Sequence, residues 1–196
     1  SIPDYSTLCR YRNWLAQDDT LSELLELINR QLTEKGLKVE KASAAVVDAT
    51  IIQISGSKQR QAIEVDEEGQ VSGQTTPSKD SDARWIKKNG LYKLGYKQHT
   101  RTDAEGYIKK LHITPANAPV VFVVEGLPKG TTTKRNRYLS KTRYVIEQSF
   151  GTLHHKFRYA RSTYFGLIKV SAQSHLKAMC LNLLKTANRL SAPVVA

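Results

Sequence analysis

Acidic residues are almost missing from the last third of the sequence. From Lys129 to the C-terminus the chain carries thirteen Lys and Arg residues and a single carboxylate, Glu147. The whole sequence has 30 basic and 18 acidic residues, a formal net charge of +12 and a pI near 9.7. Such a surface attracts polyphosphates and binds them in a salt-dependent way. Nucleic acid is therefore the leading class of partner, and Glu147 requires either a structural partner or a cation.

Cysteine, methionine and long apolar runs are also scarce. Cys9 and Cys180 lie far apart without a CxxC or His-paired spacing, so the sequence suggests neither a disulfide framework nor a zinc site and favours a cytoplasmic location. No apolar run approaches the roughly 18 residues that span a membrane, and no signal-peptide pattern opens the chain. Because the only methionine is Met179 and the first residue is Ser1, we expect an N-terminal portion of the reading frame to be absent.

Residues 1–40 predict an N-terminal helical segment. One helix follows a cap at Asp4 or Ser6, and a second runs from about Asp19 to Lys35 and ends at Gly36. This helix pair is either a helix-turn-helix DNA reader or, more commonly, a packing element. The second helix carries apolar residues at helical spacing, namely Leu21, Leu24, Leu25, Ile28 and Leu32.

The middle of the chain predicts β-strands, which makes the fold α/β. The run 44-AAVVDATIIQI-54 is typical of a strand buried on both faces, yet it contains Asp48. An ionised carboxylate there is costly unless it is paired or binds a cation; alternatively, Asp48 ends the strand and faces water. Residues 56–85 predict a long excursion or a hairpin between core strands, and residues 91–117 predict a hairpin that turns at Asp103–Gly106. Residues 119–130 contain one more apolar run.

The C-terminal third predicts two helices. On the first, Arg143, Glu147 and His154 fall on one stripe, because offsets of four and seven residues return to nearly the same angle. An adjacent apolar face carries Ile146, Phe150, Leu153 and Phe157. On the second helix an apolar stripe is predicted to face the core, with Lys177 elsewhere on the surface; the stripe consists of Leu176, Met179, Leu183, Ala187 and Leu190.

The two isolated acids, Asp48 and Glu147, suit a site for a hard cation. Mg²⁺ prefers oxygen ligands and usually takes one or two carboxylates together with phosphate oxygens. Two such ions about 4 Å apart can activate a water or a 3′-hydroxyl at a phosphodiester. The sequence thus predicts that the basic surface holds DNA while Asp48 and Glu147 hold Mg²⁺.

Several linked motifs give the chain a resemblance to a known family. VVDATII around Asp48, LGYKQH, LHITPAN and RYVIEQSFGTLHHKF resemble, in this order, the catalytic domain of bacterial insertion-sequence transposases of the DDE class. The resemblance implies an RNase H-like mixed sheet flanked by helices over residues 41–196, with the first catalytic Asp at Asp48. It also implies that Arg143 and Glu147 form the family's Arg-x3-Glu signature and that two Mg²⁺ ions act on double-stranded DNA at terminal inverted repeats.

The chain departs from the family pattern in three places. His154 stands where the signature often has Lys, and Ser140 stands where Tyr is often found. The family's second catalytic Asp lies in a D-x-G-Y-like motif, and no such motif occurs between Asn117 and Arg143. We therefore expect an internal shortening between about residues 118 and 136. Asp103 in DAEGY precedes LHITPAN and is out of order, and Glu125 is the best stand-in by pattern alone.

These observations predict a DNA transposase of the DDE type that is catalytically impaired. Arg143, His154, Lys156 and Arg158 are the predicted DNA contacts, and Asp48 and Glu147 the predicted catalytic and metal-binding residues. The alternatives are a non-enzymatic DNA-binding remnant that interferes with an intact transposase, and a general basic RNA-binding protein. The sequence leaves the oligomeric state open, a homo-oligomer included, and predicts no membrane partner.

Overall fold

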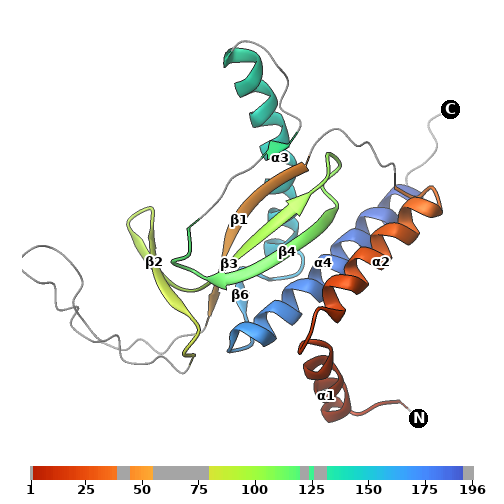
Figure 1. Ribbon diagram of the computed structural model, residues 1–196, viewed down its shortest axis with the longest axis vertical. Coiled ribbons are helices and arrows are strands. Elements are labelled where there is room, and N and C mark those ends of the chain that lie inside the picture. Colours follow the sequence, from red (N-terminus) through yellow and green to blue (C-terminus); the bar gives the residue numbers. More distant parts are fainter. Residues whose placement is uncertain (1, 39–44, 55–79, 120–123, 126–131, 192–196) are drawn as a thin grey trace, which may run out of the picture.

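The chain folds into a mixed β-sheet with helices on one of its faces (Figure 1). The structure, a computed structural model, describes residues 2–38, 45–54, 80–119, 124–125 and 132–191. None of the helices in these ranges is long and apolar enough to cross a membrane. The elements are, in order, α1 (Tyr5–Leu15), α2 (Thr20–Glu34), β1 (Ala45–Ile54), β2 (Arg84–Lys88), β3 (Leu91–Thr102), β4 (Ile108–Pro115), β5 (Val124–Glu125), α3 (Thr132–His155), β6 (Arg161–Ser162) and α4 (Leu167–Leu190).

Strand β1 lies in the middle of the sheet. It pairs antiparallel with β3 and β5 and parallel with β6, while β3 also pairs antiparallel with β2 and β4. Both antiparallel and parallel pairs are therefore present, as the predicted mixed α/β sheet requires. The predicted turn at Asp103–Gly106 is confirmed between β3 and β4, where the Gly106 amide donates to the Asp103 carbonyl at 3.0 Å.

The N-terminal helices begin and end at the predicted residues. Asp4 caps α1 by accepting a 2.7 Å hydrogen bond from the Thr7 amide, and α2 ends where Gly36 takes a left-handed conformation with φ of 66°. Helix α2 buries Leu21 and Leu25 in the same core as α4 and the sheet. The division into segments 1–40 and 41–196 stays a prediction.

Buried polar side chains fix α2 and α4 to the start of β4. The Asn182 side chain accepts a hydrogen bond from the Ile108 amide at 2.9 Å and donates to the Ile108 carbonyl at 2.8 Å. Asn29 donates to the same carbonyl at 2.9 Å and accepts from Asn182 at 3.0 Å. Because an unpaired buried amide costs about 1–3 kcal/mol, this mutual satisfaction sets the register of both helices on the sheet.

The prediction that β1 is buried on both faces is wrong. Val46, Ile52 and Ile54 are buried, whereas the residues between them that point to the other face, such as Val47 and Ile51, are only half-buried. Side chains alternate between the two faces of a strand, and the lower part of α3 lies behind β1 in Figure 1. Among the described elements, the helices thus cover one face of β1.

The predicted apolar stripe of α4 is largely on the wrong side of the helix. Of its members only Met179 is buried, while Leu176, Leu183 and Leu190 are exposed. The buried face instead carries small and polar residues, including His175, Ala178, Asn182 and Thr186. Hydrophobicity alone misplaced this face because hydrogen bonds to α2 and β4 compensate the burial of the polar residues.

His175 gives the stability of the fold a defined pH dependence. Its Nδ1 lies 2.9 Å from the Ser171 carbonyl, which can only accept, so the neutral ring donates there and accepts at Nε2 from the Ser22 hydroxyl at 3.1 Å. Burial lowers the pKa of His175, although the Ser171 hydrogen bond and Asp19 oppose this effect.

Because the folded-state pKa is lowered, the unfolded chain binds the proton first as the pH falls. The contribution of His175 is therefore fully present above the unfolded pKa near 6.5 and is lost below it, at no more than about 1.4 kcal/mol per pH unit. We expect His175→Gln to flatten the fall of the unfolding free energy between pH 7.5 and 5.5 in urea titrations. An unchanged slope in the variant would contradict this placement of the ring.

Candidate DNA and metal site

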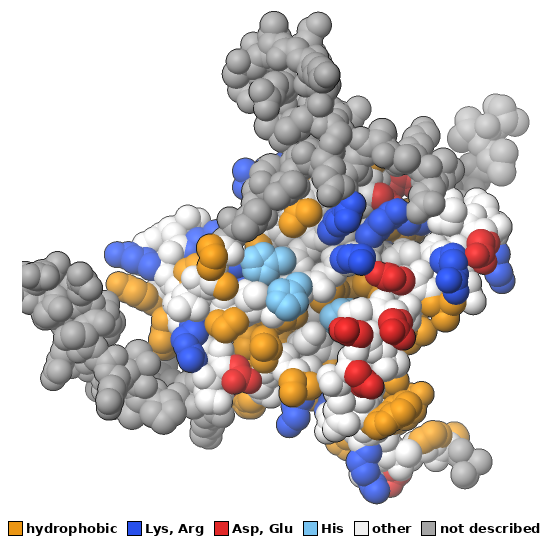
Figure 2. Space-filling view, in the orientation of Figure 1, with side chains coloured by type: hydrophobic (Ala, Val, Ile, Leu, Met, Phe, Trp, Pro, Cys, Tyr) orange, Lys and Arg blue, Asp and Glu red, His pale blue; other side chains and the backbone are white. Residues whose placement is uncertain are grey.

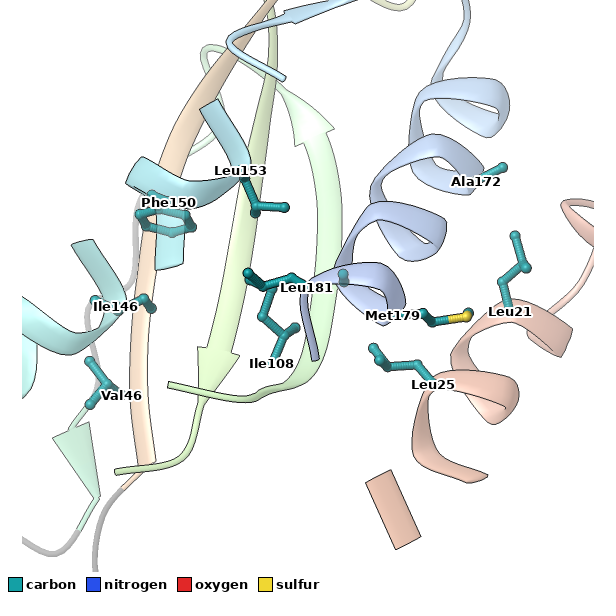
Figure 3. Packing of buried hydrophobic residues seen from close by; sticks show 11 residues of the cluster. Leu21, Leu25, Val46, Ile108, Ile146, Phe150, Leu153, Ala172, Met179 and Leu181 are labelled. Atoms are coloured by element: carbon teal, nitrogen blue, oxygen red, sulfur yellow. The ribbon is translucent and has the colours of Figure 1, made fainter. Parts of the chain in front are cut away.

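Helix α3 packs along β1 through apolar side chains. Val46 of β1 and Ile146, Phe150 and Leu153 of α3 belong to one buried cluster, in which Ile146 lies over Val46 and Phe150 lies against the strand (Figure 3). Burying one such side chain contributes about 1.5–3 kcal/mol. This cluster therefore determines how α3 sits on the sheet.

A polar contact fixes the other end of the same interface. The Thr50 hydroxyl of β1 lies 3.3 Å from Nε2 of His154 on α3. Val46 to Thr50 spans roughly 13 Å of strand, and Ile146 to His154 spans roughly 12 Å of helix. The two segments therefore run alongside each other in the same direction and in step.

Asp48 lies between these two contacts on the face of β1 that α3 covers. It is two residues from both Val46 and Thr50, and alternate residues share a face. The side chain is half-buried, and its Oδ1 accepts a 2.7 Å hydrogen bond from the Ala49 amide. Asp48 is midway between Val46 and Thr50 on the strand, as Phe150 is midway between Ile146 and His154 on the helix. Asp48 therefore lies beside Phe150 along the helix axis, roughly one helical turn after Glu147.

Glu147 lies on the solvent side of the same helix. Its Oε1 accepts a 3.0 Å hydrogen bond from Nε of Arg143, and both side chains are more than half exposed. An exposed pair of this i,i+4 kind contributes only about 0.3–0.5 kcal/mol. Arg143 is thus a structural partner for the isolated acid, but a weak one that a stronger cation can replace.

Gly151 follows Glu147 by one turn on the same stripe of α3. A Cβ added to Gly151 meets no heavy atom within 4 Å. The side of α3 that carries Glu147 is therefore open at Gly151.

The donor chemistry of the two acids fits one hard cation only partly. Carboxylate oxygens are suitable ligands for Mg²⁺, and a strand and a neighbouring helix supply one each. Across the ranges that the structure describes, no three His, Cys, Asp or Glu side chains gather into a potential metal site. Among the described residues, Asp48 and Glu147 are therefore joined by no third His, Cys, Asp or Glu.

The four predicted DNA contacts occupy different environments. Arg143, Lys156 and Arg158 are exposed, whereas His154 is half-buried against Thr50. Burial, followed by the charges of His155 and Lys93, lowers the pKa of His154. At neutral pH its ring is uncharged, so any contact of His154 with DNA is a hydrogen bond rather than an ion pair.

Lys156 and Arg158 belong to a basic loop at one end of the sheet, which we call the 155–161 loop. All of its basic residues are exposed; they are His155, Lys156, Arg158 and Arg161. The loop joins α3 to β6, whose Arg161 pairs with Gln53 at the end of β1. Arg158 has a φ of 50°, which marks a sharp turn in this loop.

Asp103 is engaged away from Asp48 and Glu147. It accepts hydrogen bonds from the Glu105 and Tyr107 amides and forms a 3.1 Å ion pair with Lys38, so it holds the β3–β4 turn. The backbone of Glu125 pairs in register with Ala45, three residues before Asp48.

Lys177, in contrast to its predicted surface position, is half-buried. Its Nζ donates to the Phe157 carbonyl at 2.6 Å and lies 4.7 Å from the centroid of the Tyr159 ring. Burial lowers the pKa of Lys177. Removing this side chain would disturb packing, so the exposed Lys169 is the better comparison for Arg143.

The space beside Gly151 gives a prediction about stability. Gly151→Ala should raise the unfolding free energy by about 0.5–1 kcal/mol, because alanine favours the helix and meets no neighbour. Gly106→Ala is the matched control and should destabilise, since Gly106 has a φ of 79° and its Cβ would lie 2.5 Å from Nζ of Lys185. Thermal unfolding of both variants measures the difference; a lower Tm for Gly151→Ala would mean that the stripe is closed.

Comparison with known proteins agrees with this arrangement. Residues 40–120 and 124–183 match the family described as "Transposase DDE domain". The transposase for insertion sequence element IS1106 of Neisseria meningitidis serogroup B is 73% identical over 230 residues, covering 95% of this chain and 80% of the relative. No solved structure shows a significant match. On these grounds the chain belongs to the DDE transposases of insertion sequences.

Proposed function

We propose that the chain binds the DNA ends of an insertion sequence but does not cut them efficiently. The observation that supports this proposal is that Asp48 lies on β1 and Glu147 on the neighbouring α3, while no group of three possible metal ligands occurs among the described residues. A DDE transposase uses three acids to hold two metal ions. Asp48 and Glu147 are the two that we assign here.

The length of the alignment supports the loss of an internal segment. The alignment with the IS1106 transposase extends over 230 residues, yet 95% of this 196-residue chain amounts to only about 186. About 44 residues of the relative therefore stand opposite no residue of this chain. That is enough for a strand and a helix.

Two further observations favour a loss near residues 118–136. The match to the family is interrupted between residues 120 and 124. The face of the sheet turned away from α3 also lacks a covering helix among the described elements, and the His side chains over β3 and β4 lie open in Figure 2. Because an antiparallel sheet can face water on one side, this open face only leaves room for a further covering segment.

In this proposal Mg²⁺, when bound, polarises the phosphodiester. Asp48 and Glu147 would hold it, and Arg143 would exchange Glu147 for a DNA phosphate. The exposed residues Lys156 and Arg158 bind the DNA backbone, and His154 supports the end of α3 by its contact with Thr50. Duplex DNA is the partner, the compartment is the cytoplasm, and residues 1–40 and 41–196 are the helical segment and the catalytic domain.

The cleavage prediction is that this chain nicks a plasmid carrying insertion-sequence ends no faster than its Asp48→Asn variant. Losing one member of a set of ligands that act together commonly costs orders of magnitude in rate. Inserting a D-x-G-Y-containing strand between Thr131 and Arg135 should restore Mg²⁺-dependent nicking. Glu147→Gln in the restored chain is the control and should abolish it.

Two outcomes would decide against the proposal. Strong Mg²⁺-dependent nicking by the chain as it stands, abolished by Glu125→Gln, would show that Glu125 supplies the third carboxylate. Strong nicking that neither Glu125→Gln nor Glu147→Gln affects would place the catalytic residues elsewhere.

The binding prediction concerns salt. If about six phosphates are neutralised, log Kd against log salt concentration should have a slope of about 5 in magnitude. Replacing Lys156 and Arg158 together with Ala should reduce it by about 2, and Arg143→Ala should weaken binding more than Lys169→Ala. Fluorescence anisotropy with a labelled duplex between 50 and 300 mM salt measures both effects, and a flat salt response would remove the electrostatic basis of the proposal.

A DNA-binding remnant that interferes with an intact transposase is the second candidate. The exposed cations of the 155–161 loop favour it, because they do not depend on the missing acid. Adding this chain to a strand-transfer reaction of an intact relative would separate the two functions. Inhibition that Lys156→Ala/Arg158→Ala relieves would favour the remnant.

A further inference from the structure

A β-hairpin that the sequence analysis missed projects from the sheet beside the basic loop. Strand β2 and the first residues of β3 pair from Arg84↔Gly95 to Lys88↔Leu91, and Asn89 and Gly90 form the turn. Their φ values of 53° and 76° are those of a type I′ turn, which matches the twist of a two-stranded ribbon. Within the described strands, β1 and β4 pair with β3 only from Gly95 onward, so the hairpin stands out from the sheet (Figure 1).

The hairpin exposes large apolar side chains. Trp85 is 51% exposed, Leu91 66% and Tyr92 57%. Register pairing places Tyr92 opposite Lys87, and alternation places Trp85 on the same face as Lys87. Exposing such side chains together is unusual on a surface that faces only water, so this face suits a ligand.

Positive charge accompanies these aromatic residues, and no acid lies between Ala83 and Thr102. Lys87 and Lys88 are exposed and Lys93 is half-buried, while Lys87 Nζ lies 5.5 Å from the centroid of the Tyr92 ring. Figure 2 shows blue and orange side chains together over the hairpin. Arg84 is occupied, because its Nη1 donates to the Ser81 and Ala83 carbonyls.

The two acids that precede the hairpin are engaged by the fold. Asp80 accepts hydrogen bonds from the Tyr96 hydroxyl and from the Gly166 amide, and Asp82 accepts from the Leu167 amide. Both carboxylates thus face the first turn of α4. The hairpin itself contributes no carboxylate that could neutralise Lys87, Lys88 and Lys93.

The base of the hairpin lies next to the 155–161 loop. Gln53 of β1 pairs with Gly95 on one side and with Arg161 on the other, so two strand spacings of about 4.8 Å separate the hairpin base from the loop. From Gly95 to Gly90 the ribbon extends roughly 17 Å further. The lysines of the hairpin therefore continue the positive surface of the loop.

We propose that the hairpin Arg84–Gly95 is a second DNA-binding element, which contacts the same duplex that the 155–161 loop binds. The proposal rests on the proposed function. A two-stranded ribbon fits the major groove, which is about 12 Å wide, and lysines on both faces reach phosphates on either side. Trp85 and Tyr92 supply apolar contacts. A second copy of the chain would instead bring like charges together at this surface.

The test compares two triple variants that lose the same charge. Lys87→Ala/Lys88→Ala/Lys93→Ala should weaken duplex binding at least tenfold at 150 mM salt and lower the slope of log Kd against log salt by about 2 to 3. Arg30→Ala/Lys35→Ala/Lys110→Ala removes three exposed cations from α2, the residue after it and β4, and should change neither quantity by more than a third as much. Circular dichroism of both variants checks that the fold is kept.

The fluorescence of Trp85 gives a second measurement that needs no lysine variant. The chain has two tryptophans, so Trp14→Phe leaves Trp85 as the only one. Its emission should change on titration with duplex DNA and saturate together with the anisotropy. No change in emission while the duplex binds would overturn the proposal.

Different results separate the hairpin from the proposed function. If the wild-type chain binds no duplex DNA, both the proposed function and the hairpin inference are overturned. If it binds, and Lys156→Ala/Arg158→Ala weakens binding while the hairpin variant does not, only the hairpin inference is overturned. It is also overturned if the hairpin variant changes the sedimentation coefficient but not the DNA affinity, because the surface would then contact a second copy.

Discussion

The packing of α3 on one face of β1 is the constraint on which the rest of the site depends. Val46 and Ile146 at one end and Thr50 and His154 at the other hold eight residues of helix in step with four of strand. Asp48 lies between these contacts. The buried cluster contributes several times more than the exposed Arg143–Glu147 pair, whose loss costs only about 0.3–0.5 kcal/mol. The acid on the helix is therefore positioned by its apolar neighbours and not by its own ion pair.

The same packing determines where the positive charge lies. Because α3 ends at the edge of the sheet and β6 pairs with β1, the 155–161 loop is held at the Gln53 end of the strand. Strand β3 reaches that end from the other side and continues into the hairpin. Two segments far apart in the sequence thus present cations at one end of the sheet, while the two acids lie further along β1 and α3.

The sequence predicted the elements better than it predicted the faces they bury. Helical spacing, the Asp4 cap and the stop at Gly36 suffice to locate α1 and α2, because these signals are local. The buried face of α4 was predicted wrongly, since Asn182 and His175 are compensated by partners on α2 and β4 that no local pattern reveals. The hairpin was missed although Asn89-Gly90 between Trp-Ile-Lys-Lys and Leu-Tyr-Lys is a strong turn signal, because the charged composition of residues 56–85 favoured an irregular excursion.

For the site itself, the sequence located Asp48 and Glu147 on the right elements but could not place their side chains. Periodicity puts Glu147 beside Arg143, yet only the tertiary structure shows that both side chains are more than half exposed. The arrangement also places the basic residues and the two acids at different positions on the sheet. The basic residues of the 155–161 loop and of the hairpin lie at the Gln53 end of the sheet, apart from Asp48 and Glu147. In the function that we propose, the third carboxylate belonged to a lost internal segment, so its loss would weaken metal binding and cleavage while leaving the basic surface in place to bind DNA.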